Sequence, residues 1–453
     1  MAKRFAPPDG RIFVCSPVDV GVLGIIASRT DAASMAIAAA LKQTLALVDD
    51  GRDRAMACDI ELVTIDGPHV EMRAPWRHFT HLPRAVLVCS RHRGTTDRVL
   101  TTHCVGNVGA ADLGGSPQSL GRAAPGLHSA LMSALRSHAP PEYVVCSEAT
   151  HHGPAPTAVP LLFVEIGSDA AAWADPMAAQ AVAAAIASVR SRPPDGSKQF
   201  IAIGDGHYPD VVDPIIRETD WACGHQLPRW SLEALQERPH LAVEAAVASH
   251  APFALCLDIP ESVAMALDSA GIRRVDAGFL RSTDGIPPAV IAAIEAQLGP
   301  IGEDVHVAAH RADGPPGVAH RVDPDWLDRL ADRDPQAVQT AYAPAIAVAP
   351  PTGVALCADR TAAAAVTARL LRLSSRLIGP TWADATGVTV SVERLDPALA
   401  QAAGVPEGPL FGALASGEAV TIDGRQVDPA SVHRIDRSQY APIRLEHIAE
   451  GEQ

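Results

Sequence analysis

Short apolar runs that alternate with alanine-rich helical segments constrain the fold of this chain more than any other feature. Residues 85–90 and 161–166 are nearly unbroken apolar runs, which is typical of strands buried on both faces of a parallel sheet. Residues 31–48 and 175–189 have apolar side chains at helical spacing. This alternation predicts right-handed crossovers, so the expected fold class is α/β, a mostly parallel sheet flanked by helices. Further strands are expected at 11–16, 60–65, 99–107, 143–147, 199–204 and 253–258, and a further helix at 119–138.

Histidine-containing polar loops follow several of these strands. They lie at residues 103–107, 148–152 and 204–208, and residues 223–228 add a fourth histidine beside a glycine. In open α/β sheets the ligand binds outside the carboxyl ends of the strands. We therefore expect these loops to converge on one site.

The stretch from residue 148 to residue 168 is the centre of that expectation. His151 and His152 stand in a segment with one glycine and three prolines, so the backbone there is an irregular loop. Glu148 and Glu165 lie at or inside apolar runs, where an unpaired carboxylate costs several kcal/mol. Each carboxylate therefore faces a cation or a hydrogen-bond donor, and a metal ion is one such cation.

Histidines and carboxylates without cysteine thiolates favour a catalytic zinc ion, which takes three protein ligands and keeps one position for water. The candidate zinc ligands are His151, His152, His207 and His225, with His103 as a further candidate. The candidate catalytic residues are Glu148, Glu165, His151 and His103. One of the carboxylates would act as general base. The alternative is a loop whose histidines only bind backbone groups.

Glycines and arginines near these loops are candidates for binding an anion. Residues 106–109 and 114–115 could present backbone N–H groups to an oxyanion or phosphate, although they match no dinucleotide or Walker motif. The four arginines of a local basic patch are Arg84, Arg91, Arg93 and Arg98. Such a patch suits a phosphate backbone, and a solvated charged face is the alternative.

Length and composition restrict the class of protein. A chain of 453 residues is long for one domain, and the texture changes near residue 299, so we expect a catalytic domain over 1–299 and a C-terminal extension over 300–453. The eight cysteines contain no CxxC pair, and no apolar run has the roughly 20 residues that a membrane span needs. We expect a cytoplasmic protein without a membrane partner, and its net charge of −15 is acidic.

Several of these motifs, in this order along the chain, resemble the motif series of the archaeal-type D-aminoacyl-tRNA deacylases. The matching segments are 102–107 with 114–115, 148–154, 163–168, 204–208 and 223–228. The sequence departs from the family pattern at Asp205 and at residues 209–210. The part beyond residue 299 resembles the C-terminal extension of longer members, and its loop 404–412 suggests a role in holding the tRNA end.

The resemblance implies a function. It implies hydrolysis of the ester between a D-amino acid and the 3′-terminal ribose of tRNA, zinc as cofactor, a phosphorylase/hydrolase-like fold and a monomer. The partner would be the acceptor end of D-aminoacyl-tRNA and not DNA. The substrate-binding residues would be Asn107, Gly114, Gly115, Tyr208, Arg91 and Arg93. Two alternatives stay open: a zinc-dependent amidase or carboxypeptidase-like hydrolase of small substrates, and a non-catalytic tRNA-binding protein.

Overall fold

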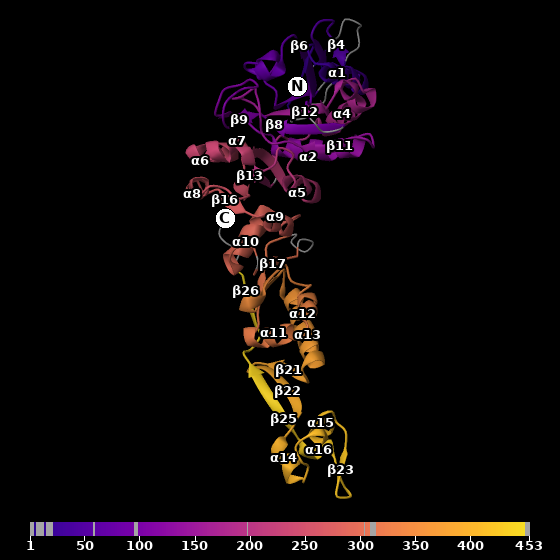
Figure 1. Cartoon of the computed structure of the whole chain (residues 1–453), viewed down its shortest axis with the longest axis vertical. Coiled ribbons are helices and arrows are strands. Elements are labelled where there is room, and N and C mark those ends of the chain that lie inside the picture. Colours follow the sequence, from indigo (N-terminus) through magenta and orange to yellow (C-terminus); the bar gives the residue numbers. More distant parts are fainter. Residues whose placement is uncertain are drawn as a thin grey trace. The chain divides into compact units, whose positions relative to one another are not determined.

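Figure 1 shows the computed structural model of the chain, which divides into two compact units, residues 1–284 and residues 285–453. The structure describes residues 4–5, 13–14, 21–57, 59–94, 98–196, 198–302, 304–308 and 314–448. Of the strand expected over 11–16, only β2 (Phe13–Val14), paired with β1 (Arg4–Phe5), lies within these residues. Among the described helices, none is long and apolar enough to cross a membrane.

The first unit is built on an eight-stranded sheet with the order β11-β8-β12-β7-β3-β6-β5-β4. Its strands are β3 (Leu23–Ser28), β4 (Val48–Asp49), β5 (Arg54–Met56), β6 (Ile60–Ile65), β7 (Ala85–Arg91), β8 (Val99–Cys104), β11 (Val144–Ser147) and β12 (Leu161–Gly167). The four central strands β12, β7, β3 and β6 are parallel. The expected α/β class with a mostly parallel, helix-flanked sheet is thereby confirmed.

Strand β8 runs against its neighbour β12, which corrects the assumption that all strand ends meet at one edge. Only seven residues separate β7 from β8, too few for the crossover that a parallel strand needs. In the resulting register His103 lies opposite Phe163, and Thr101 lies opposite Glu165. Because side chains alternate along a strand, Phe163 and Glu165 point to the same face of the sheet.

The two faces of this sheet are covered differently. Helices α1 (Ala32–Thr44), α2 (Pro125–His138) and α4 (Pro176–Val189) lie together against one face, where Leu87 and Leu162 are fully buried (Figure 1). Burying one such side chain stabilises the fold by about 1.5–3 kcal/mol. The opposite face carries Val86, Val88 and Phe163 and packs against the segment that contains η1 (His69–Glu71) and η2 (Pro75–His78).

Helix α2 begins later than the sequence suggested. The helix expected from residue 119 starts at Pro125, because proline fits the first turn of a helix but not its interior. Residues 119–120 instead form the short strand β10 (Ser119–Leu120), which pairs with β9 (Gly106–Asn107).

A second, fully parallel sheet completes the first unit, with the order β14-β13-β15-β16. Its strands are β13 (Gln199–Asp205), β14 (Ala222–Pro228), β15 (Phe253–Cys256) and β16 (Arg273–Val275). The remaining helices of the first unit are α3 (Ala170–Trp173), α5 (Val212–Glu218), α6 (Leu232–Glu237), α7 (His240–Ala248), α8 (Glu261–Ser269), α9 (Ala277–Ser282) and η3 (Arg229–Ser231). The end of β13 leads directly to His207 and Tyr208.

The second unit contains three antiparallel sheets, with the orders β17-β19-β20-β18-β26, β21-β22-β25 and β23-β24. Its strands are β17 (His306–Val307), β18 (Val318–Arg321), β19 (Ala347–Ala349), β20 (Val354–Cys357), β21 (Thr381–Asp384), β22 (Gly387–Leu395), β23 (Val420–Ile422), β24 (Arg425–Val427), β25 (His433–Tyr440) and β26 (Arg444–His447). Its helices are α10 (Pro288–Leu298), α11 (Pro324–Ala331), α12 (Pro335–Ala341), α13 (Arg360–Leu377), α14 (Pro397–Ala402), α15 (Pro409–Ala415), α16 (Pro429–Val432) and η5 (Pro350–Thr352).

Candidate active site

The segment that follows β11 joins the two sheets of the first unit through its backbone. The Glu148 N–H donates to the carbonyl oxygen of Thr102 in β8 at 3.2 Å. The Ala149 N–H donates to the carbonyl oxygen of His207, beyond β13, at 2.8 Å, and the Thr150 N–H donates to the carbonyl oxygen of Gln226 in β14 at 2.7 Å. These bonds bring the 148–152 loop beside β8, the 204–208 loop and β14; residues 223–228, expected as a histidine-containing loop, belong to the buried strand β14.

Glu148 lies at the centre of this arrangement, with a fully buried side chain. Its Oε2 is 3.0 Å from His207 Nε2 and 3.8 Å from His151 Nε2, and its Oε1 is 3.2 Å from His92 Nδ1. Burial alone would raise the pKa of Glu148. The contacts with His207 and His92 outweigh burial and hold this pKa well below its usual range. The carboxylate is therefore ionised at neutral pH.

Glu165 is the second buried carboxylate and points from the middle of β12. Its Oε2 is 3.5 Å from His92 Nδ1, and its Oε1 is 3.9 Å from His103 Nε2. Burial acts to raise the pKa of Glu165, but His103 and His92 lower it to about 2. Both predicted carboxylates thus face cationic partners. One of those partners is a residue that the sequence did not suggest.

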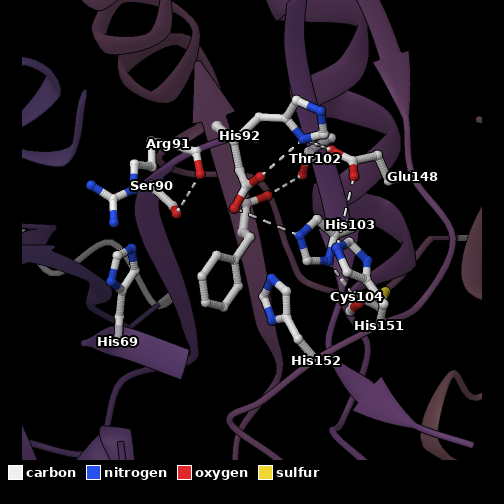
Figure 2. Close-up of polar contacts among 12 residues, drawn as sticks. His69, Ser90, Arg91, His92, Thr102, His103, Cys104, Glu148, His151 and His152 are labelled. Atoms are coloured by element: carbon white, nitrogen blue, oxygen red, sulfur yellow. Dashed lines mark hydrogen bonds and ion pairs between the residues drawn. The ribbon is translucent and has the colours of Figure 1, made fainter. Parts of the chain in front are cut away.

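That residue is His92, which directly follows β7 and is buried between the two carboxylates (Figure 2). Its Nε2 forms a 2.8 Å hydrogen bond with the hydroxyl of Tyr208. Burial would lower the pKa of His92, yet Glu148 and Glu165 raise it to about 10. The arginines on either side of it were expected to contact phosphate, whereas His92 itself was not predicted. Its position at the end of a buried strand was the signal that could have identified it.

Three other histidines share one hydrogen-bonding pattern. The Nδ1 atoms of His103, His151 and His152 lie 3.0, 2.8 and 2.7 Å from the backbone carbonyl oxygens of Cys104, Ala149 and Gly153. A carbonyl oxygen only accepts, so each Nδ1 carries a proton, and Nε2 is the nitrogen left to bind a metal ion. This is the state in which a histidine binds a metal ion.

The aromatic ring of Phe163 fixes two of these imidazoles. It stacks on His103, with ring centroids 5.3 Å apart, and on His69 at 5.6 Å. The ring of His152 meets it edge-on at 4.7 Å. Because Phe163 is fully buried, these contacts restrict the planes of the histidine rings.

The geometry fits a metal ion. Ligand atoms of His103, His151 and His152 all lie within 4.8 Å of one another, and so do those of Glu148, His151 and His207. His103 Nε2 is buried and has no hydrogen-bond partner among the described residues, which is costly unless a ligand completes it. A further acidic group, His92 with the two glutamates, satisfies the same distance limit.

His225 stands apart from these groups. Its Nδ1 is 3.0 Å from the hydroxyl of Thr150, and its Nε2 is 2.8 Å from the carbonyl oxygen of Gly121. Burial lowers its pKa to about 4, so the ring is neutral. Because both of its nitrogens form hydrogen bonds, His225 holds Thr150, the residue before His151, in place.

Comparison with known proteins identifies the family. Residues 79–265 match the D-aminoacyl-tRNA deacylase family. This range includes every residue of the three groups described above. A D-aminoacyl-tRNA deacylase of Haloarcula marismortui is 33% identical over 452 residues, which cover 91% of this chain and 98% of the relative. A D-aminoacyl-tRNA deacylase of Methanoregula boonei is 31% identical and covers 90% of this chain and 96% of the relative.

The chain belongs to the D-aminoacyl-tRNA deacylase family. The resemblance inferred from the motifs is thereby confirmed. A solved protein described as a conserved protein of unknown function has the same fold, with a TM-score of 0.54 and 24% identity. The match covers 58% of this chain and 97% of that protein.

In this member of the deacylase family, the predicted glycines shape the loop that carries the histidines. A Cβ atom on Gly114 would stand 2.1 Å from the carbonyl oxygen of Val70, and one on Gly153 would stand 2.4 Å from the same oxygen. The amide of Asn107 donates to the Gly114 oxygen at 2.9 Å. These contacts hold the segment around Gly115 against the histidine loop.

The predicted arginines of this deacylase lie beside an aromatic ring. The guanidinium carbons of Arg91 and Arg93 are 5.4 and 5.5 Å from the centroid of the Trp173 ring. The backbone N–H of Arg91 also donates to the carboxylate of Asp31, which caps helix α1. The hydroxyl of Tyr208, the remaining predicted substrate-binding residue, forms a hydrogen bond with His92, which contacts both carboxylates.

Proposed function

We propose that this chain hydrolyses the ester bond between a D-amino acid and the 3′-terminal ribose of tRNA. This reaction returns mischarged tRNA to use and limits the toxicity of D-amino acids. Family membership supports the reaction. The observation that carries it is the convergence of three imidazole Nε2 atoms beside a buried, ionised carboxylate.

A zinc ion would be held by His103, His151 and His152. Three imidazoles whose Nδ1 atoms are bound to backbone oxygens match a catalytic zinc site, which keeps its fourth position for water. When bound, zinc would supply a water of nearly neutral pKa and polarise the ester carbonyl. The alternative group of Glu148, His151 and His207 shares the Nε2 atom of His151, and one lone pair binds one ion. We therefore propose a single zinc ion.

Glu148 is the proposed general base. It is ionised, and its Oε2 lies between His151 and His207, so it is within reach of a water next to the histidines. The side chain of His207 is 35% exposed, and it gives Glu148 a neighbour through which a proton can leave to solvent. Glu165 lies 3.9 Å from the Nε2 of His103 and adds a negative charge beside the proposed zinc ligands.

The partner follows from the reaction. The proposed substrate is the acceptor end of D-aminoacyl-tRNA, with Asn107, Gly114 and Gly115 shaping the pocket and Arg91 and Arg93 facing the RNA. The catalytic domain is assigned to residues 1–299 and the extension to residues 300–453. All residues proposed for catalysis come from the first unit of a single chain, which is consistent with a monomeric enzyme.

The decisive test measures release of D-tyrosine from D-Tyr-tRNA, with L-Tyr-tRNA as the matched control. We expect hydrolysis of the D-substrate only, loss of activity after chelation and recovery when zinc is added back. A zinc-loaded, folded protein that leaves D-Tyr-tRNA intact would rule the proposal out. Free peptides and amino acid amides belong in the same assay, because turnover of those alone would identify a small-substrate hydrolase.

A further inference from the structure

Trp173 is a half-buried aromatic residue at the end of the short helix α3, and no step proposed so far uses it. Two guanidinium groups approach its ring, those of Arg91 at 5.4 Å and Arg93 at 5.5 Å. Both distances fall within the roughly 6 Å range of cation–π attraction. The three side chains therefore form one positively charged cluster, which we call the Trp173 platform.

The platform is linked to the hydrolytic centre through His92. The indole Nε1 of Trp173 donates a 3.0 Å hydrogen bond to the backbone oxygen of His92, whose imidazole contacts Glu148 and Glu165. Helix α3 is itself capped, because the carboxylate of Asp169 accepts from the Ala172 N–H at 2.9 Å. One residue thus separates the ring from the buried carboxylates.

The two arginines differ in how far nearby carboxylates compensate their charge. The Nε of Arg91 lies 3.8 Å from the buried carboxylate of Asp31, so part of its charge is compensated. Arg93 is exposed, and among the described residues it has no acidic partner. The platform therefore presents an exposed guanidinium group beside an aromatic ring.

This combination suits a single-stranded nucleic acid. Unpaired bases are bound by stacking on aromatic rings or guanidinium planes, while arginines neutralise the phosphates. The scissile ester of the proposed substrate sits on the last ribose, so the last unpaired nucleotides must lie beside the hydrolytic centre. We propose that the Trp173 platform binds the unpaired 3′-terminal nucleotides of tRNA, an inference that rests on the proposed function.

The test uses two RNA hairpins with the same acceptor stem, one with the unpaired 3′ nucleotides of tRNA and one with a blunt end. We expect the full-length parent chain to bind the first more tightly in fluorescence anisotropy. Trp173→Leu should reduce that preference by roughly tenfold, the contribution of one stacked base. Arg93→Gln should weaken binding and make it less dependent on salt concentration.

Two further variants separate stacking from other effects. Trp173→Phe keeps an aromatic face but loses the bond to His92, so it should retain most of the preference. Trp230→Leu removes an exposed tryptophan, 62% accessible, that lies outside the platform, and it should match the parent. An unchanged preference in folded Trp173→Leu and Arg93→Gln, or no preference in the parent, would overturn the inference. Hydrolysis of D-Tyr-tRNA by the parent is measured in parallel, since its absence would reject the proposed function and not the platform alone.

Discussion

His92 is the residue that allows two carboxylates to be buried side by side. Its protonated ring lies within 3.5 Å of an oxygen of both Glu148 and Glu165, and without it the two negative charges would share a site that excludes water. Two like charges so arranged cannot both stay ionised. The low pKa of Glu165 therefore depends on the charge of a neighbouring histidine.

His92→Gln should lower the free energy of unfolding of the metal-free protein by about 3 kcal/mol at neutral pH, because it leaves buried carboxylates uncompensated. In the parent protein, the stabilisation that comes from the lowered pKa of Glu165 is present above pH 4.5 and is lost as pH falls toward 2. The part due to the raised pKa of His92 is complete below pH 6.5 and lost as pH rises through about 10. Urea unfolding across this range measures both slopes. Equal slopes in parent and variant would contradict the assignment.

His225 is fully buried and His152 is partly buried, and we expect different roles for them. His225→Gln should reduce stability by about 1–3 kcal/mol, since it breaks bonds to Thr150 and Gly121, and should leave zinc per chain unchanged. His152→Gln should lower zinc content instead. Metal analysis of the two purified proteins makes the comparison. Loss of zinc from a folded His225→Gln protein would return this histidine to the list of ligands.

Residue types were easier to predict than their orientation. The sequence identified Glu148, Glu165, His151 and His207 as members of one site because polar groups in apolar runs need partners, and the structure brings them together. It also grouped His225 with them, because spacing along the chain does not say which way a ring points. Both nitrogens of His225 turned out to face Thr150 and Gly121.

At the scale of elements, the loop that carries His151 and His152 is held by close backbone packing more than by side chains. Gly153 and Gly114 both approach the carbonyl oxygen of Val70, and the Gly153 N–H donates to the oxygen of Leu113 at 3.1 Å. Any side chain at these glycines meets backbone, which cannot move aside cheaply. The position of the histidines therefore depends on a neighbouring loop.

Gly114→Ala should destabilise the protein by about 2 kcal/mol and lower both zinc content and deacylation. Its φ of +81° is strained for alanine, and the new Cβ would stand 2.1 Å from the Val70 oxygen. Gly109→Ala is the matched control, because a Cβ there meets nothing within 4 Å. Thermal unfolding and metal analysis compare the two. Equal behaviour of the two variants would mean that the packing of this loop does not position the histidines.

The elements themselves were largely predictable. Apolar runs predicted three of the four central strands, β6, β7 and β12, and alanine-rich periodicity predicted helices α1 and α4 with ends shifted by a few residues. The fourth central strand, β3, was not predicted. The reversed direction of β8 was missed, although the short link from β7 could have indicated it. Because of this reversal, His103 near the end of β8 lies opposite Phe163 in β12.

At the scale of the whole molecule, the proposed catalytic residues and their supporting contacts all belong to residues 1–284. The match to a solved protein of the same fold covers 97% of that protein but only 58% of this chain. The fold therefore exists in a protein that has no counterpart to the rest of this chain. The second unit has hydrophobic clusters of its own. Changes of texture in the sequence indicated a division, and the contacts within the chain place it after Asp284.

The charge of the second unit bears on its role in RNA binding. Residues 285–453 contain 13 arginines and no lysine against 21 aspartates and glutamates, so phosphates are repelled on average. We therefore expect a protein of residues 1–284 to keep its zinc and its kcat, with a KM for D-Tyr-tRNA that is unchanged or lower. Steady-state kinetics of the full-length and shortened proteins at two salt concentrations measure this. A KM that rises on truncation, and rises further at higher salt, would instead support the role in holding the tRNA end that the loop 404–412 suggested.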